Sequence, residues 1–244
     1  RARPRMKAGG SGGFRRLDEA GRLSFLAEHV EKFEELILEA RDPEILGGLA
    51  GLMVEAPVGF WGVPLGIAGG FVIDGVDCLV PLATEEPSVV AAASHGAKLA
   101  SLGGGFRFVV ESPPPKLIAH PFVVEKICRA SCEVRTESMG SDPLVAAEIC
   151  RKIVKANLVA REGIYRAATQ QKGIMNGVEA VLRALGIDPA PLQTAAHLAA
   201  SDNPRGFGPL TSYEFLEDAR VLRAEILLPI PSGVLRYSGS PARE

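Results

Sequence analysis

The chain has 244 residues, 27 of them basic and 29 acidic, so its formal net charge is -2. Hydrophobic residues make up 47% and charged residues 23%, which are ordinary values for a globular protein and exclude a mainly disordered chain. A nucleic-acid-binding protein typically carries a basic stripe or patch. Since no such stripe follows the first few residues, we expect no nucleic-acid partner.

No stretch approaches the run of about 18 apolar residues that a membrane-spanning helix requires. The basic segment from Arg1 to Lys7 is not followed by the apolar segment of a secretory signal. We therefore expect a cytoplasmic protein without a membrane partner. Four cysteines are spread over the chain: Cys78, Cys128, Cys132 and Cys150. Because no His or Cys pair completes a zinc-binding set, the pattern predicts free thiols and no metal.

The first element predicted along the chain is a helix. Residues 1–13 end in a glycine-rich stretch and are predicted to form a disordered lead-in. From Leu23 to Ile37, apolar residues recur at helical spacing with charged residues between them. Asp42 and Pro43 then end this helix.

A β-hairpin and a second helix follow. Residues 64–73 and 76–80 read as strands, and Asp74 and Gly75 between them are typical of a tight turn. Pro87 and the alanine-rich residues behind it indicate the start of a buried helix.

The middle of the chain is less regular. Residues 101–132 contain runs of three glycines and three prolines, which predict a loop-rich connection around a short strand at 106–110. Asp142 or Ser141 is positioned to cap a helix that runs from Pro143 to about Val159.

Residues 165–177 are polar and rich in small side chains and glycines, a composition that would let the backbone approach a ligand closely. Helical segments at 178–185 and 191–200 and a strand at 220–229 complete the chain. The predicted fold class is therefore α+β, with helices and strands mixed.

Two sites carry candidate chemistry. Glu85 and Glu86 stand at a helix start, where the helix dipole favours carboxylates, so a purely capping role is the alternative. Arg166, Lys172 and Asn176 stand among small residues and glycines, where a polar turn is the alternative.

Together these segments resemble one known family. Residues 79–94, LVPLATEEPSVVAAAS, resemble the catalytic-glutamate segment of the class II, bacterial-type 3-hydroxy-3-methylglutaryl-CoA (HMG-CoA) reductases. Residues 165–177, YRAATQQKGIMNG, resemble their catalytic-lysine loop. Asp188 follows Lys172 by sixteen positions, as the aspartate of the family follows its lysine. The resemblance covers roughly residues 14–106 and 145–228.

The resemblance implies roles for these side chains. Enzymes of the family reduce HMG-CoA to mevalonate with two hydrides from NAD(P)H, and many class II members run the reverse reaction. By resemblance, Lys172 stabilises the developing oxyanion, Glu86 transfers protons, and Asp188 holds Lys172 and tunes Glu86. Ser88, Arg166 and Asn176 match substrate-binding positions, and the guanidinium of Arg166 suits a carboxylate or phosphate.

The resemblance also implies a large mixed α/β domain with a long central helix, and a homodimer with active sites at its interface. The family inserts a cofactor-binding domain of roughly a hundred residues before the lysine loop. Only about 60 residues separate Phe106 from Thr169 here, which is too short for a full nucleotide-binding domain. We therefore predict one domain over residues 14–244, with a reduced excursion at about 106–142 and the small NAD(P)-binding domain reduced or absent.

A second departure concerns the C-terminus, where class II enzymes carry a catalytic histidine and this chain has no histidine beyond His197. Two enzymatic hypotheses stay open. The chain is a shortened, NAD(P)H-dependent reductase acting on a coenzyme A thioester, or it is an isomerase, lyase or cyclase that keeps the Glu86, Lys172 and Asp188 site without redox chemistry. A non-enzymatic ligand-binding relic is the third reading.

Overall fold

The computed structural model describes residues 17–29, 52, 62–111 and 124–231. The chain divides into two compact units, one formed by Gly9–Pro64 and the other containing Leu65–Glu244. In the first unit, helix α2 (Glu19–His29) confirms the start of the first predicted helix. The rest of that helix, its predicted end at Asp42 and Pro43, and the lead-in at 1–13 lie outside the described residues.

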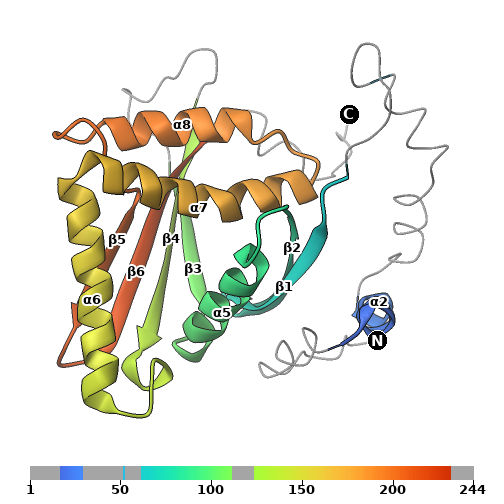
Figure 1. Cartoon of the computed structure of the whole chain (residues 1–244), viewed down its shortest axis with the longest axis horizontal. Helices are drawn as coiled ribbons and strands as arrows, with labels where there is room; N and C mark the ends of the chain where they lie inside the picture. Colours follow the sequence, from blue (N-terminus) through green and yellow to red (C-terminus); the bar gives the residue numbers. More distant parts are fainter. Residues whose placement is uncertain (1–16, 30–51, 53–61, 112–123, 232–244) are drawn as a thin grey trace. The chain divides into compact units, whose positions relative to one another are not determined.

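The second unit is a six-stranded sheet with helices, which confirms the mixed α/β class (Figure 1). The strands are β1 (Leu65–Ile73), β2 (Val76–Ala83), β3 (Phe106–Glu111), β4 (Val124–Arg135), β5 (Thr211–Leu216) and β6 (Val221–Pro231). The helices are α5 (Val89–Leu102), α6 (Pro143–Glu162), α7 (Ile164–Ala184) and α8 (Ala190–Ser201), with a short 3-10 helix at Thr136–Ser138. The strand order is β2-β1-β3-β4-β6-β5. Helix α7, with 21 residues, is the longest of the described helices, and α6 has 20.

The β1–β2 hairpin forms as predicted. Asp74 and Gly75 adopt φ values of 48° and 80°, the left-handed conformation that a tight two-residue hairpin turn needs. The two strands pair antiparallel from Ile73 opposite Val76 to Leu65 opposite Ala83. The hairpin ends directly before Glu85 and Glu86, so it determines where these carboxylates enter the fold.

Strand β3 links the hairpin to the rest of the sheet. It meets β1 in one parallel pair, Ile73 opposite Phe106. Gly105, with φ of 86°, precedes this pair, and a Cβ there would lie 2.4 Å from the carbonyl oxygen of Val72. Only glycine fits this close approach of two backbones. Beyond it, β3 pairs antiparallel with β4, from Phe106 opposite Cys132 to Glu111 opposite Ile127.

The prediction of a loop-rich connection up to Cys132 is wrong at β4, a twelve-residue strand. Its neighbours are β3 on one side and β6 on the other, so it lies inside the sheet. Cys132 and Val134 pack toward α6 and α5, whereas the alternate residues Ser131 and Glu133 face the opposite side, because side chains alternate along a strand. Strand β5 was not predicted either; it pairs antiparallel with β6.

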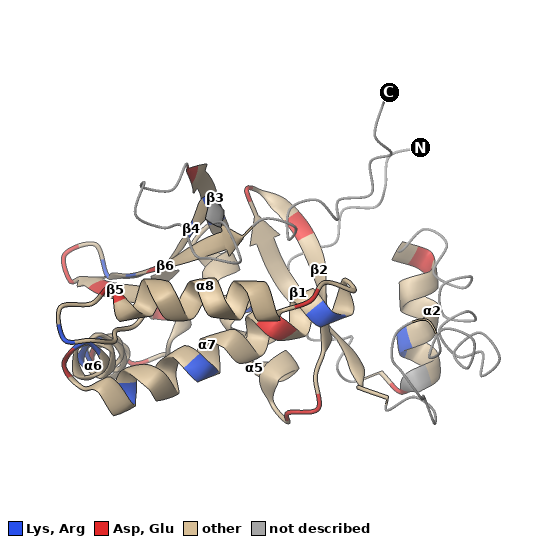
Figure 2. Cartoon of the chain, turned by 90° about the horizontal axis from the view of Figure 1, so that it is seen from above, with Lys and Arg blue, Asp and Glu red and all other residues tan. Residues whose placement is uncertain are grey.

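Helices α5 to α8 lie along one face of the sheet (Figure 2). Three buried clusters join the two layers. One is centred on Met175, Leu182 and Leu192 between α7, α8 and β6. Another contains Ala68, Leu82 and Ala180, between the hairpin and α7. The third contains Val134, Cys150 and Leu222, between α6 and the strands β4 and β6.

Helix α6 begins as predicted, because Asp142 accepts hydrogen bonds from the backbone N–H groups of Leu144 (2.8 Å) and Val145 (3.3 Å). The alternative interpretation of residues 165–177 as a polar turn is wrong, since these residues form most of α7. Packing of Ala167, Met175 and Leu182 on the buried face outweighs the low helix propensity of the two glycines.

A buried polar network fixes α7 against its neighbours. The side-chain amide of Gln170 donates to Asn157 Oδ1 on α6 (2.8 Å) and to Thr211 Oγ1 on β5 (2.9 Å). Asn157 and Thr211 are both buried. Among the described residues, none of the helices combines the length and the apolar character of a membrane-crossing segment.

Candidate functional site

Glu86 lies in the loop of residues 84–88, which joins β2 to α5 and is called here the β2–α5 loop. Its side chain is exposed, and its backbone N–H donates to Thr84 Oγ1 at 3.1 Å. Ser88, the last residue of the loop, has a φ of 73°, a conformation that is strained for any residue other than glycine. The hydroxyl of Ser88 does not cap α5. The loop therefore presents Glu86 to solvent in a constrained backbone.

Lys172, Arg166 and Asn176 all lie on α7. Lys172 and Arg166 are exposed and Asn176 is half-buried. Lys172 donates a hydrogen bond to the side-chain oxygen of Asn176, one turn further along the helix. Among the described residues, Arg166 forms no ion pair, so its guanidinium is free to bind an anion.

Asp188 lies between α7 and α8 and is exposed. Its Oδ1 accepts a hydrogen bond from the backbone N–H of Ala190 at 3.0 Å, so it stabilises the first turn of α8. The carboxylate keeps one oxygen for another partner. A capping role and a chemical role are therefore both compatible with its position.

Among the described residues, no hydrogen bond or ion pair joins the three candidate catalytic groups to one another. The loop that carries Glu86 touches the C-terminal end of α7 through an ion pair of Glu85 with Arg183. Asp188 follows the same end of the helix. Lys172 lies eleven residues before Arg183, about 16 Å along the axis at 1.5 Å per residue. Within the described part of one chain, no ion pair joins Lys172 to Glu86 or Asp188.

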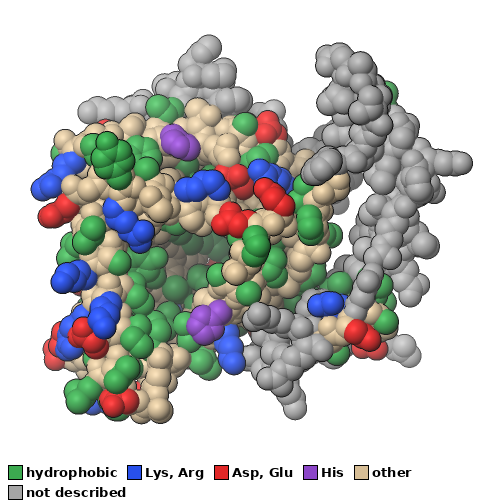
Figure 3. Space-filling model, in the orientation of Figure 1, with side chains coloured by type: hydrophobic (Ala, Val, Ile, Leu, Met, Phe, Trp, Pro, Cys, Tyr) green, Lys and Arg blue, Asp and Glu red, His purple; other side chains and the backbone are tan. Residues whose placement is uncertain are grey.

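Charged side chains gather around α7 and the start of α5, above a hollow that α5, α6 and α7 surround (Figure 3). Hydrophobic side chains cover much of the walls of this hollow. Exposed apolar residues on α6 and at the start of α7 include Leu158 and Ile164, each 51% exposed, and Tyr165, 92% exposed. An apolar surface of this kind is typical of a binding or subunit interface.

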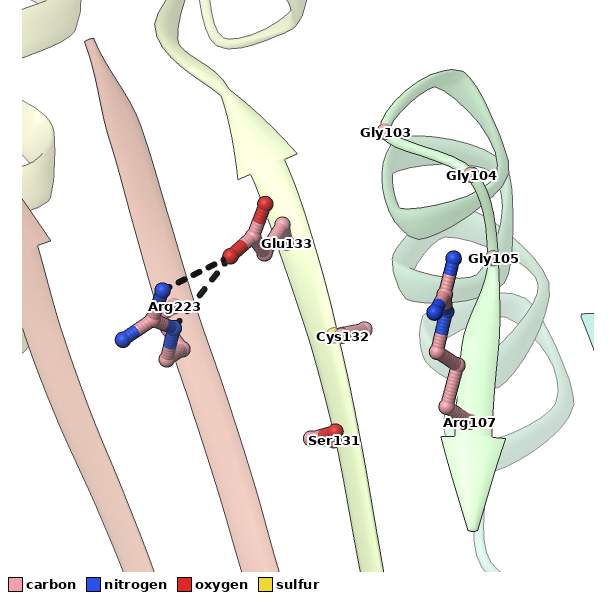
Figure 4. Close-up of a pocket in the computed structure, with 8 residues that line it drawn as sticks. All are labelled: Gly103, Gly104, Gly105, Arg107, Ser131, Cys132, Glu133 and Arg223. Atoms are coloured by element: carbon pink, nitrogen blue, oxygen red, sulfur yellow. Dashed lines mark hydrogen bonds and ion pairs between the residues drawn. The ribbon is translucent and has the colours of Figure 1, made fainter. Parts of the chain in front are cut away.

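A cavity of about 290 Å³ lies on the other face of the sheet (Figure 4). Arg107, Ser131, Glu133 and Arg223 line it, together with the three glycines from Gly103 to Gly105. The charge of Arg223 is already matched, because it binds Glu133 at 3.0 Å and Glu214 at 3.4 Å. The cavity contains none of the candidate catalytic residues.

This cavity does not fit a dinucleotide. Backbone N–H groups of a glycine-rich turn bind pyrophosphate only when they are free. Here the N–H groups of Gly103 and Gly105 donate to the carbonyl of Ala100, and that of Gly104 donates to Ser101. This cavity therefore offers no free backbone N–H groups at its glycine turn to bind the pyrophosphate of NAD(P)H.

The four cysteines are free, as predicted. Burial raises the pKa of Cys132 and of Cys150, which favours their protonated, unreactive thiols. Among the described residues, no cluster of three or more His, Cys, Asp or Glu side chains could hold a metal ion.

Reasoning from sequence alone missed Arg183, whose side chain joins Glu85 to the buried Glu179 on α7. No local pattern marks it, because Arg183 and Glu85 are distant in sequence. The buried Gln171, whose side-chain amide has no hydrogen-bond partner among the described residues, has no local pattern that marks it either.

The fold is a mixed α/β unit whose candidate catalytic groups lie along, or close to the end of, one long helix, α7. The family model described as hydroxymethylglutaryl-coenzyme A reductase matches the chain in two segments, residues 20–121 and 115–235. The chain belongs to this family, which is a family of oxidoreductases.

One curated relative is the 3-hydroxy-3-methylglutaryl-coenzyme A reductase of Archaeoglobus fulgidus, 25% identical over 315 aligned positions. The alignment covers 91% of this chain and 72% of the relative. Since 315 positions exceed the 244 residues of this chain, the relative contains residues without a counterpart here.

Solved structures of the reductase from Streptococcus pneumoniae share the fold. One has a TM-score of 0.78 at 22% identity and covers 89% of this chain and 85% of the other. A second, a class II enzyme described as bound to NADPH in open conformations, has a TM-score of 0.77 at 22% identity. It covers 87% of this chain and 75% of the other.

Proposed function

We propose that the chain converts an acyl-thioester or carbonyl substrate by the chemistry of the class II reductases, HMG-CoA to mevalonate or the reverse. The observation that carries this proposal is the set of exposed acidic and basic groups at the family's catalytic positions, none of which forms an ion pair within the described residues. Lys172 is exposed on α7, and Glu86 and Asp188 are exposed near the end of the same helix.

In this proposal Lys172 stabilises the negative charge that develops on the substrate oxygen when the carbonyl carbon is attacked. A positioned cation in a site that excludes water stabilises such an oxyanion strongly. The hydrogen bond to Asn176 holds the ammonium group on one side of α7. Glu86 gives and takes the proton that the oxygen or the leaving thiolate needs.

Ser88, Arg166 and Asn176 are proposed to bind the substrate. Arg166 is exposed and without an ion pair among the described residues, so its planar guanidinium is available to a substrate carboxylate or phosphate. Asp188 is proposed to act on Lys172 and Glu86 through its charge. NAD(P)H, when bound, would supply the hydride that the reduction requires.

We also propose a homodimer with shared sites. The separation of Lys172 from Glu86 within one chain supports it, because a second copy can bring the Lys172 of one subunit to the Glu86 of the other. The apolar walls of the hollow beneath α7 support it as well. Mixing Glu86→Gln and Lys172→Ala chains tests this: shared sites restore about a quarter of the wild-type activity after random re-pairing. No restoration argues for sites within single chains.

A redox-independent isomerase, lyase or cyclase is the second candidate, and a specific observation favours it. Strands β3 and β4 pair directly, and only residues 112–123 connect them. The two segments matched by the family model meet at residues 115–121, where the family is expected to carry its cofactor domain. This supports a cofactor domain that is reduced or absent.

Titration with NADH and NADPH separates the two candidates. The reductase proposal expects saturable binding of one nucleotide and its oxidation in the presence of HMG-CoA. Binding of neither nucleotide, together with conversion of a thioester or carbonyl substrate, replaces the reductase with the redox-independent enzyme.

A further inference from the structure

Arg183 connects two elements that flank the proposed site. Its Nη1 lies 3.9 Å from Glu85 Oε2 in the β2–α5 loop, and its Nη2 lies 3.4 Å from Glu179 Oε2 on α7. Glu85 is the residue directly before Glu86. A single guanidinium therefore links the loop that carries Glu86 to the helix that carries Lys172.

The helix end of this link is fixed by burial. The side chain of Glu179 is only 9% exposed, and a buried carboxylate needs a charged or hydrogen-bonding partner. Arg183 lies one turn further along α7 and is the ion-pair partner of Glu179 among the described residues. This pairing holds the guanidinium, whose planar fork keeps a second N–H group for Glu85.

The β2–α5 loop, at the other end of the link, has a strained backbone. Ser88 has a φ of 73° and its hydroxyl leaves the start of α5 uncapped. Within the loop, the N–H of Glu86 is held by Thr84 Oγ1. A strained backbone conformation persists only where its surroundings impose it. Val89, directly after Ser88, packs against the cluster of Ala68, Leu82 and Ala180, and the ion pair of Glu85 with Arg183 adds a second contact from outside the loop.

We infer that Arg183 is a positioning residue, which holds the β2–α5 loop against α7 and so places Glu86 relative to Lys172. This inference rests on the proposed function for its catalytic consequence. The Glu85 side chain is 73% exposed, so the ion pair contributes little to folding stability. Its effect is on the position of the loop.

Glu85→Gln is the informative substitution, because it breaks the link and leaves the buried Glu179 paired with Arg183. Arg183→Gln is the second variant and removes both contacts. Arg151→Gln is the matched control: Arg151 is also a half-exposed helix arginine, and it binds Glu217 from another element at 3.0 Å. Two readouts are taken for each variant, amide hydrogen exchange of residues 84–88 and steady-state kinetics with HMG-CoA.

The expected result is that Glu86 amide exchange accelerates several-fold in Glu85→Gln and Arg183→Gln but not in Arg151→Gln. The double variant should exchange no faster than Arg183→Gln alone, because both changes break the same link. The kcat of Glu85→Gln should fall by about tenfold or more with KM little changed, since small misplacements of a catalytic group are costly.

Unchanged exchange in Glu85→Gln overturns the inference, and so does faster exchange with unaltered kcat. Hydrogen exchange needs no substrate, which separates this test from the proposed function. If the wild-type chain does not convert HMG-CoA, the proposed function fails, while accelerated exchange in Glu85→Gln alone still establishes the link between the loop and α7.

Discussion

The ammonium group of Lys172 donates a hydrogen bond to the side-chain oxygen of Asn176, one turn further along the exposed side of α7. A lysine held in this way is oriented before any substrate arrives, and orientation before binding is what makes a cation effective toward an oxyanion. Neither side chain contributes to the buried clusters that join α7 to the sheet.

Lys172→Ala should therefore remove activity without affecting the fold. Loss of one oxyanion-stabilising group typically lowers kcat by about 10²- to 10³-fold. Circular dichroism should be unchanged because Lys172 is exposed. Lys152→Ala on α6 is the control, since this lysine is 72% exposed and lies 3.9 Å from Glu148. Equal kcat values for the Lys172→Ala and wild-type enzymes would exclude Lys172 from the mechanism.

Asp188→Asn separates the capping role of Asp188 from its proposed chemical role. An Asn side-chain oxygen can still accept the hydrogen bond from Ala190. The free energy of unfolding should therefore stay within about 0.5 kcal/mol of the wild-type value. The lost charge should nevertheless lower kcat, if Asp188 acts on Lys172 and Glu86. Full activity of this variant would show that Asp188 is only a helix cap.

Gln170 and Gln171 are adjacent in sequence, but among the described residues only the side chain of Gln170 has hydrogen-bond partners. Gln170 donates to Asn157 and Thr211, whereas Gln171, 1% exposed, has no partner for either amide atom in the described part of the chain. Gln171→Met should raise the free energy of unfolding by about 1 kcal/mol, since it removes an unsatisfied buried amide. Gln170→Met should lower it by about 1–3 kcal/mol. Urea denaturation measures both; equal destabilisation would mean that Gln171 is satisfied after all.

Stability should depend on pH through Glu217. A hydrogen bond from Arg151, and then its charge, hold the pKa of Glu217 below its usual range. A carboxyl group whose pKa is lower in the folded state stabilises the fold above its unfolded pKa of about 4.3, and this contribution disappears as the pH falls through the folded value. Glu217→Gln should therefore be less stable than wild type at pH 7, and the difference should shrink toward pH 2. A difference that is constant with pH would contradict the assignment.

Local features of the fold could be predicted from the sequence. The Asp74–Gly75 turn and the Asp142 cap each depend on a few adjacent residues, and both form as expected. Strand β4 could not be predicted in this way. Its residues on the helix side include Cys128 and Ala130, which contrast weakly with Ser131 on the other side. Pairing with β3 and β6 makes it a strand, and that pairing is not local.

The segment around Lys172, residues 165–177, could not be predicted from its local sequence either. Gly173 and Gly177 make it resemble a loop, yet distant packing partners on α8 and β6 make it a helix. The candidate catalytic residues were identified by resemblance to a family, and their roles stay predictions. The contact of Arg183 with Glu85 joins segments far apart in the sequence, so it is seen only in the structure.

The measurement that tests the central claim most directly records NADPH consumption and thiol release from HMG-CoA in one reaction, for the wild-type and Lys172→Ala chains. The proposed reductase oxidises two NADPH for each coenzyme A thiol released, and Lys172→Ala does neither. The proposed chemistry at Lys172 is contradicted if the wild-type chain neither oxidises NADPH nor releases thiol. It is also contradicted if Lys172→Ala does both at the wild-type rate.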